Sequence, residues 1–108
     1  MQTNPISIKD ELSQISKFWS PRVIGTFNDS KVILAKCAGK FPWHVHKTAD
    51  EMFQVLSGEL TIEFEDKKVT LKKGECAFVY AGQRHQTYAR GETHILLIEK
   101  TNQAHTGD

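Results

Sequence analysis

Residues 39–58, GKFPWHVHKTADEMFQVLSG, carry most of the information in this sequence. His44 and His46 stand two positions apart, which puts both imidazoles on the same face of a β-strand. Glu51 follows after four further residues, a length that suits a short turn into the next strand. Gly58 ends the stretch at a hairpin turn, where glycine tolerates a positive φ. The stretch therefore predicts two neighbouring strands that carry polar side chains on one face.

Strand and turn patterns continue on both sides of this stretch. Leu60, Ile62 and Phe64 alternate with polar residues, which is the period of a half-buried strand. Turn-forming residues recur at short intervals, and 90–92 is predicted to separate a strand at 86–88 from another at 95–98. We expect roughly eight or nine short strands in an antiparallel sandwich or barrel. The pattern does not fit a fold that alternates strands and helices, since only one helical segment is predicted.

That helical segment lies near the N-terminus. Ser7 can cap it, and Pro21 disfavours helix at the residue before it. The spacing predicts a short amphipathic helix over 8–18, because apolar residues recur there at three- and four-residue steps: Ile8, Leu12, Ile15 and either Phe18 or Trp19.

Length and composition set further bounds. The chain has 108 residues, the size of one domain, and its net charge of +1 gives no basic surface of the kind that binds nucleic acid. No apolar run approaches the length of a membrane span, and the first residues lack the pattern of a signal peptide. We therefore expect a cytoplasmic protein with no nucleic-acid or membrane partner, in which Cys37 and Cys76 are reduced thiols.

The polar residues suggest a metal site. His44, His46, Glu51 and the later His85 offer three imidazoles and one carboxylate, a set that suits Fe, Mn, Co, Ni, Cu or Zn better than Ca or Mg. Four such ligands on one side of an octahedral ion leave two positions for water, oxygen or substrate. A His-X-His pair by itself is weak support, since it is more often an ordinary polar strand face.

The glycines around these residues strengthen the hypothesis. Gly39, His44, His46, Glu51 and Gly58 resemble the first sequence motif of the cupin superfamily, with four residues rather than the usual five between Gly39 and His44.

A second cupin motif is matched further along the chain. Gly74, Gly82 and His85 are in register with it, and fifteen residues separate the two motifs, as in small prokaryotic cupins. Tyr80 stands where the motif usually has proline, and Ala89 where it usually has asparagine.

The similarity to a group of small single-domain cupins extends over about the whole chain. The resemblance implies an all-β fold, an antiparallel jelly-roll β-barrel with a short N-terminal helix. It implies one cupin domain over 1–108, with a helical arm at 1–20, the barrel at 21–99 and a tail at 100–108. It also implies one divalent transition metal (Fe, Mn, Ni, Cu or Zn) bound inside by His44, His46, Glu51 and His85.

A pocket is expected beside this metal. Phe53 and Val55 share a strand face with Glu51, and Thr87 shares a face with His85, so all three are predicted to line it. Tyr80 is a further candidate at its rim, although an aromatic residue of the core or of an interface is the more common role.

Several functions fit such a site. One is an enzyme, dioxygenase- or isomerase-like, that acts on a small polar or acidic molecule. No general base is evident from the pattern, which weakens isomerase chemistry more than oxygen chemistry. The alternative is a non-catalytic, metal-dependent domain that binds or senses a small molecule. A structural jelly roll with relic ligands is disfavoured, because all four ligands are present. Catalytic residues, substrate and metal stay open.

A homodimer is also expected. Residues 32–34 and 95–98 are continuous apolar runs rather than alternating ones, so both faces of these strands require cover. The cupin resemblance implies the same assembly.

Overall fold

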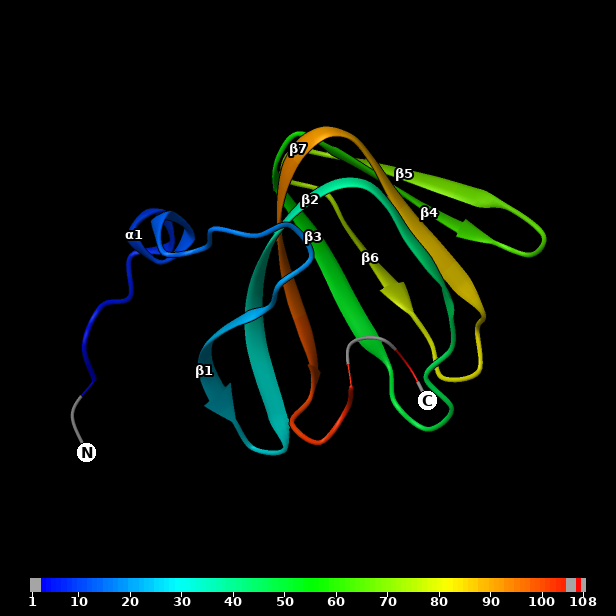
Figure 1. The fold of residues 1–108 in the computed structure, drawn as a ribbon. Coiled ribbons are helices and arrows are strands. Elements are labelled where there is room, and N and C mark those ends of the chain that lie inside the picture. Colours follow the sequence, from blue (N-terminus) through cyan, green and yellow to red (C-terminus); the bar gives the residue numbers. More distant parts are fainter. Residues whose placement is uncertain (1–2, 105–106, 108) are drawn as a thin grey trace.

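The computed structural model describes residues 3–104 and 107 (Figure 1). The fold is all-β and antiparallel, with one short N-terminal helix, as predicted. The described residues form one helix and seven strands: α1 (Ile8–Ser13), β1 (Arg22–Phe27), β2 (Ser30–His44), β3 (Glu51–Ser57), β4 (Glu59–Phe64), β5 (Lys68–Lys72), β6 (Cys76–Val79) and β7 (His85–Lys100).

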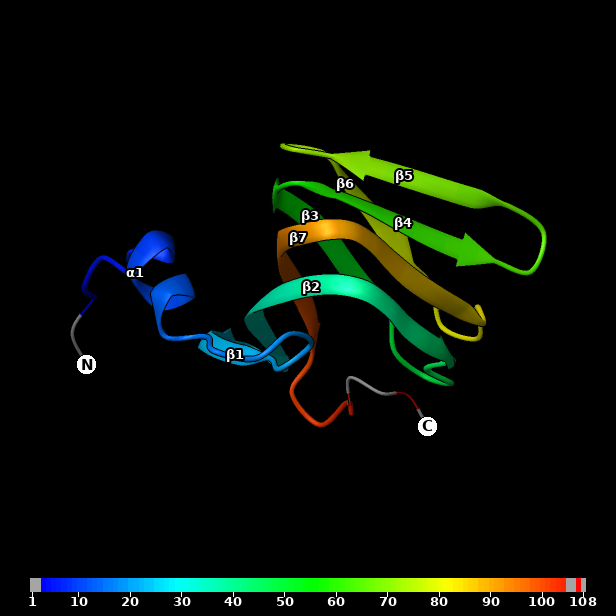
Figure 2. The same ribbon diagram turned by 45° about the horizontal axis from the view of Figure 1, so that its top comes forward.

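Two long bent strands, β2 and β7, hold the two halves of the jelly roll together (Figure 2). One half has the strand order β1-β2-β7-β3-β6, while β4 joins β5 to the first part of β7. The register between β2 and β7 shifts between Cys37 and Gly39, and Gly39 has a φ of +72°. A bulge of this kind bends a strand and lets one strand serve both halves.

The prediction of eight or nine short strands was wrong for this reason. Residues 90–92 do not separate two strands, because β7 runs through them without a break. The hydroxyl of Thr93 donates to the backbone oxygen of Gly91 and so satisfies a backbone acceptor at the bend. Glycine and charged residues marked a bend in the sheet here, and local sequence does not distinguish a bend from a turn.

The hairpin at Gly58 agrees with the sequence. Its φ is +89°, and a Cβ atom at this position would lie 2.5 Å from the Thr93 hydroxyl oxygen. That hydroxyl also accepts a hydrogen bond from the Glu59 backbone N–H at 3.2 Å. Both the backbone angle and the close approach of β7 therefore favour glycine.

The N-terminal helix is shorter than predicted. It begins after Ser7, whose hydroxyl accepts from the Asp10 backbone N–H as expected, but it ends at Ser13 rather than near residue 18. Beyond it the chain bonds to β2: the Trp19 backbone N–H donates to the Lys36 oxygen at 2.8 Å, and the Lys36 ammonium donates to the Ile15 oxygen at 3.0 Å. These tertiary bonds replace the helical ones that the spacing suggested.

Inward-facing residues of both halves form one core, which includes Ile33, Val55, Leu60 and Ile62. The two cysteines are free, as expected; Cys37 is buried, and its burial raises the pKa of the thiol to about 12, whereas Cys76 is exposed. Within the described part of the chain, no helix has the length and apolar character that crossing a membrane requires.

Candidate metal centre

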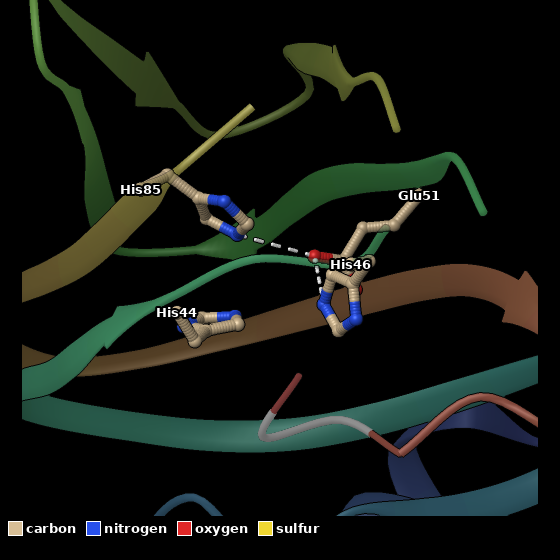
Figure 3. Close-up of side chains that lie close together, drawn as sticks. All are labelled: His44, His46, Glu51 and His85. Atoms are coloured by element: carbon tan, nitrogen blue, oxygen red, sulfur yellow. Dashed lines mark ion pairs between the residues drawn. The ribbon is translucent and has the colours of Figure 1, made fainter. Parts of the chain in front are cut away.

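The four predicted ligands lie close together in the folded chain (Figure 3). His44 is the last residue of β2, Glu51 the first of β3 and His85 the first of β7. His44 and His85 pair directly across β2 and β7. His46 lies just beyond β2, in the connection to β3. Residues that are 41 positions apart in the sequence thus become neighbours because their strands start or end together.

One potential ligand atom from each of these residues lies within 4.8 Å of all the others. The Glu51 Oε1 atom is 3.2 Å from His46 Nε2 and 3.4 Å from His85 Nε2. The rings of His44 and His85 have centroids 4.2 Å apart. Three of the side chains are buried and His44 is half-buried, so the cluster reaches the edge of the interior on the His44 side.

Backbone acceptors orient two of the imidazoles. Nδ1 of His44 lies 2.8 Å from the Pro42 oxygen, and Nδ1 of His85 lies 2.9 Å from the Gln83 oxygen. A carbonyl only accepts, so these contacts assign the proton to Nδ1 in each ring. The lone pair then sits on Nε2, directed into the cluster, as in metal-bound histidines whose second nitrogen is held by the protein.

Hydrogen bonds join the two loops next to the clustered residues. The Gly82 backbone N–H donates to the His46 oxygen at 2.8 Å, and the Ala81 backbone N–H donates to Asp50 Oδ1 at 2.9 Å. The loop before His85 is therefore fixed to the loop between His46 and Glu51. This brace sets the relative position of ligands that belong to different strands.

The electrostatics favour ligand forms that bind cations. Burial lowers the pKa of His44, which keeps its imidazole neutral. Burial by itself would raise the pKa of Glu51, but the adjacent imidazoles of His46 and His85, whose Nε2 atoms lie 3.2 and 3.4 Å from Oε1, outweigh it and hold that pKa below its usual range. A neutral imidazole at His44 and an ionised carboxylate at Glu51 are suitable donors for a divalent first-row metal.

Unsatisfied atoms point to the same fit. Glu51 Oε1 and His85 Nε2 are buried and have no hydrogen-bond partner among the described residues. Buried polar atoms are costly unless they are paired or bind a metal. A divalent ion within the cluster would satisfy both atoms, so the residues fit a metal.

A cavity opens beside the cluster and reaches His44 and Glu51. Its volume is about 50 Å³, and its walls are mostly apolar. The lining residues are Trp19, Pro21, Ile33, Ala35, Phe41, His44, Glu51, Phe53, Thr87, Ile95, Leu97 and Glu99.

Two of the four predicted lining residues, Phe53 and Thr87, are in this wall. Val55 is not: it is fully buried in the core, two residues further along β3. Tyr80 is not either, since 57% of it is exposed and its ring stacks on Phe78. Tyr80 directly follows the last residue of β6, and neither it nor Val55 is among the residues that line this cavity.

Sequence reasoning missed Glu99 and Trp19. Glu99 is 2% exposed, and burial next to Glu51 raises its pKa to about 8. Trp19 has a φ of +61°, donates its indole N–H to the Ala38 oxygen at 2.9 Å and packs on Phe41. Glu99 is two residues after Leu97, so the alternation of side chains along a strand could have placed it on the same, inner face. No sequence signal marked Trp19, whose position depends on the segment after α1.

The comparison with known families agrees with this geometry. The family described as "Cupin domain" matches residues 30–99, which includes all four clustered residues. This chain belongs to the cupin family. Its similarity to the uncharacterized protein YdbB of Bacillus subtilis (strain 168) is 36% identity over 97 residues, covering 89% of this cupin and 83% of that protein.

Solved structures resemble this cupin as well. A cupin-2 domain containing protein from Shewanella frigidimarina has 40% identity and a TM-score of 0.86, with 88% of this chain and 93% of that one covered. Hydroquinone 1,2-dioxygenase PnpCD, solved in complex with Fe3+, has a TM-score of 0.80 at 20% identity, with 94% of this chain and 33% of that one covered. The second likeness concerns the fold alone.

The two residues that depart from the cupin motifs, Tyr80 and Ala89, are not among the four clustered residues. Ala89 is fully buried and pairs with Gly39 and Leu60. An asparagine at this position would bring a buried amide that needs partners. Tyr80 keeps a backbone N–H that proline would lack, and this group donates to Gln83 Oε1 at 2.8 Å.

Proposed function

We propose that this cupin binds one divalent transition metal through His44, His46, Glu51 and His85, and that a small molecule binds at the open side of the metal. The observation that carries the proposal is the convergence of the four ligand atoms within 4.8 Å of one another. The buried, unsatisfied Glu51 Oε1 and His85 Nε2 atoms support it. When bound, such an ion supplies Lewis acidity or redox chemistry.

The cavity supports the small-molecule part of the proposal. It adjoins the metal cluster on the side of His44 and Glu51, so a ligand there can contact the ion. Aromatic and aliphatic walls exclude water, and in such surroundings each polar contact to the ligand is strengthened. The chain's own residues would thus orient the ligand, with the polar groups gathered at the metal end.

Metal analysis of the native, untagged protein tests this function. We expect close to one equivalent of a first-row divalent metal per chain, and loss of it in His46→Ala with the far-UV circular dichroism spectrum unchanged. Replacing His94, a histidine outside the ligand set, by Ala is the matched control and should keep the metal. Wild-type protein that stays metal-free after incubation with Fe2+, Mn2+, Ni2+, Cu2+ and Zn2+ would contradict the proposal.

Catalysis is a separate step of the same proposal. We favour an enzyme that acts on a small polar or acidic molecule, with dioxygenase- or isomerase-like chemistry, over a binding or sensing domain. Oxygen uptake by the iron-loaded protein, or substrate isomerisation by the metal-loaded protein, supports the enzyme. Saturable ligand binding without turnover supports the binding or sensing domain.

We also propose that this cupin forms one domain, divided into an arm (1–20), a barrel (21–99) and a tail (100–108). We further propose that two copies of it form a homodimer. The outer face of the five-strand half carries an apolar row across four paired strands: Val32, Ile98, Met52 and Phe78. Phe78 is 55% exposed. A second copy could cover this row. Light scattering should give twice the chain mass for wild type and the single-chain mass for Phe78→Asp, and a monomeric wild type would contradict the proposal.

A further inference from the structure

Glu99 is a polar residue of the cavity wall that is not one of the four proposed metal ligands. It lies on the inner face of β7, lines the cavity and is 2% exposed. Neither of its carboxylate oxygens has a hydrogen-bond donor among the described residues. A buried carboxylate without donors is unfavourable. A ligand in the cavity can supply the missing donor.

The neighbours of Glu99 are fixed by strand register. Lys31 pairs with it across β2 and β7, and the Lys31 ammonium lies 3.6 Å from Glu99 Oε1 while it donates to the Gln103 oxygen at 3.1 Å. On the other side, Ile98 pairs with Met52, so Glu99 and the metal-cluster residue Glu51 are neighbours on adjacent strands. A ligand atom that contacts Glu99 is therefore close to one that contacts the metal.

The charges around the cavity and its volume limit the kinds of ligand that can bind there. The Lys31 ammonium already lies 3.6 Å from Glu99 Oε1, so a ligand cation is not required there and a neutral hydroxyl suffices as the donor. A divalent ion with Glu51 leaves one positive charge, which a single carboxylate neutralises. The cavity volume of about 50 Å³ corresponds to a few water molecules, and hence to a short carbon chain.

We propose that Glu99 is a ligand-binding residue and that the cavity takes a small 2-hydroxy carboxylate with a short apolar tail. The ligand carboxylate binds the metal, the neighbouring hydroxyl donates to Glu99, and the tail packs on Phe41 and Phe53. This inference rests on the proposed function, because the carboxylate needs the metal. Glu99 confers selectivity for the hydroxyl.

Isothermal titration of the zinc-loaded protein with lactate and 2-methoxypropanoate tests the proposal. Both probes offer a carboxylate and a second oxygen to the metal, but only lactate can donate to Glu99. We expect wild type to favour lactate by about tenfold, which is the range of one hydrogen bond to a charged group. In Glu99→Leu, or in Glu99→Ala if leucine is not tolerated, the preference should fall below about threefold with zinc content unchanged.

Two further variants sharpen the result. Glu99→Gln keeps an acceptor oxygen and should retain part of the preference. Thr61→Val removes a polar group on β4, at a residue outside the cavity lining, and should leave the preference intact. Equal preference in wild type and Glu99→Leu, an equal loss in Thr61→Val, or no binding of lactate would overturn the inference while zinc binding stands. Failure of wild type to bind zinc would instead overturn the proposed function.

Discussion

The two walls of the cavity are built in different ways. The polar wall, which includes Glu99, Glu51 and His44, lies on neighbouring strands whose register fixes each side chain. The aromatic wall includes Trp19, which comes from an irregular segment and has a left-handed backbone conformation. Strands supply the first wall, whereas a few hydrogen bonds to the edge of β2 hold Trp19 in the second.

This difference means that the residues that bind the metal and the residues that shape the cavity can be changed separately. Metal ligands on paired strands are held in fixed relative positions by the hydrogen bonds of the sheet, and a metal site requires such fixed positions. A wall contributed by a segment outside the sheet can change its residues without moving the metal cluster. We therefore expect substitutions in the polar wall to affect metal and ligand binding, and substitutions in the aromatic wall to affect stability and cavity shape.

Loss of a metal ligand should have the largest effect. At a free Zn2+ concentration 100 times the dissociation constant, bound metal stabilises the wild-type fold by about 2.7 kcal/mol. His85→Ala should abolish this gain, because it removes a fully buried ligand. Chemical denaturation with Zn2+ and with a chelator measures the difference. Equal zinc stabilisation of His85→Ala and wild type would remove His85 from the ligand set.

Trp19→Ala tests the aromatic wall. We expect it to lower the free energy of unfolding by about 2 kcal/mol, since a half-buried ring and the indole hydrogen bond to Ala38 are lost. Zinc content should not change. Phe78→Ala is the control at an exposed aromatic residue, and it should cost less than about 0.5 kcal/mol at a protein concentration where the chain is monomeric. Loss of zinc in Trp19→Ala would contradict the separation of the two walls.

Glu99 gives the polar wall a pH dependence in metal-free protein. Its folded-state pKa of about 8 lies above that of an ordinary glutamate, so between about pH 5 and pH 8 the folded chain retains a proton that the unfolded chain has released. This group's contribution to stability therefore falls as pH rises.

Glu99→Gln removes that titration. The stability of this variant relative to wild type should increase by about 1.4 kcal/mol or more from pH 5 to pH 8, the equivalent of at least one unit of pKa. Denaturation of chelator-treated protein at both pH values measures it. A constant difference between the two proteins would mean that Glu99 titrates normally.

Tyr80→Pro lies outside both walls and should have the smallest effect. It restores the proline that is usual in the cupin motif and removes a backbone N–H that donates to exposed Gln83. We expect a change of at most about 1 kcal/mol in the free energy of unfolding and no change in zinc content. A large loss of zinc would show that the loop before His85 depends on Tyr80.

The sequence by itself determined the all-β fold class and the candidate metal ligands. Alternation at residues 60–64 fixes an inward and an outward face, and the His44-X-His46 spacing fixes two imidazoles on one side, because both are local consequences of strand geometry. The cupin motif spacings then related these residues to Glu51 and to the distant His85.

Only the tertiary structure decided the rest. Whether 90–92 turns or bends depends on pairing with β2, and the end of α1 depends on Lys36, far along the chain. The roles of Trp19 and Glu99 follow from which strand each one meets. These outcomes depend on long-range contacts that compete with local preference, and no local pattern reports the free energy of such contacts.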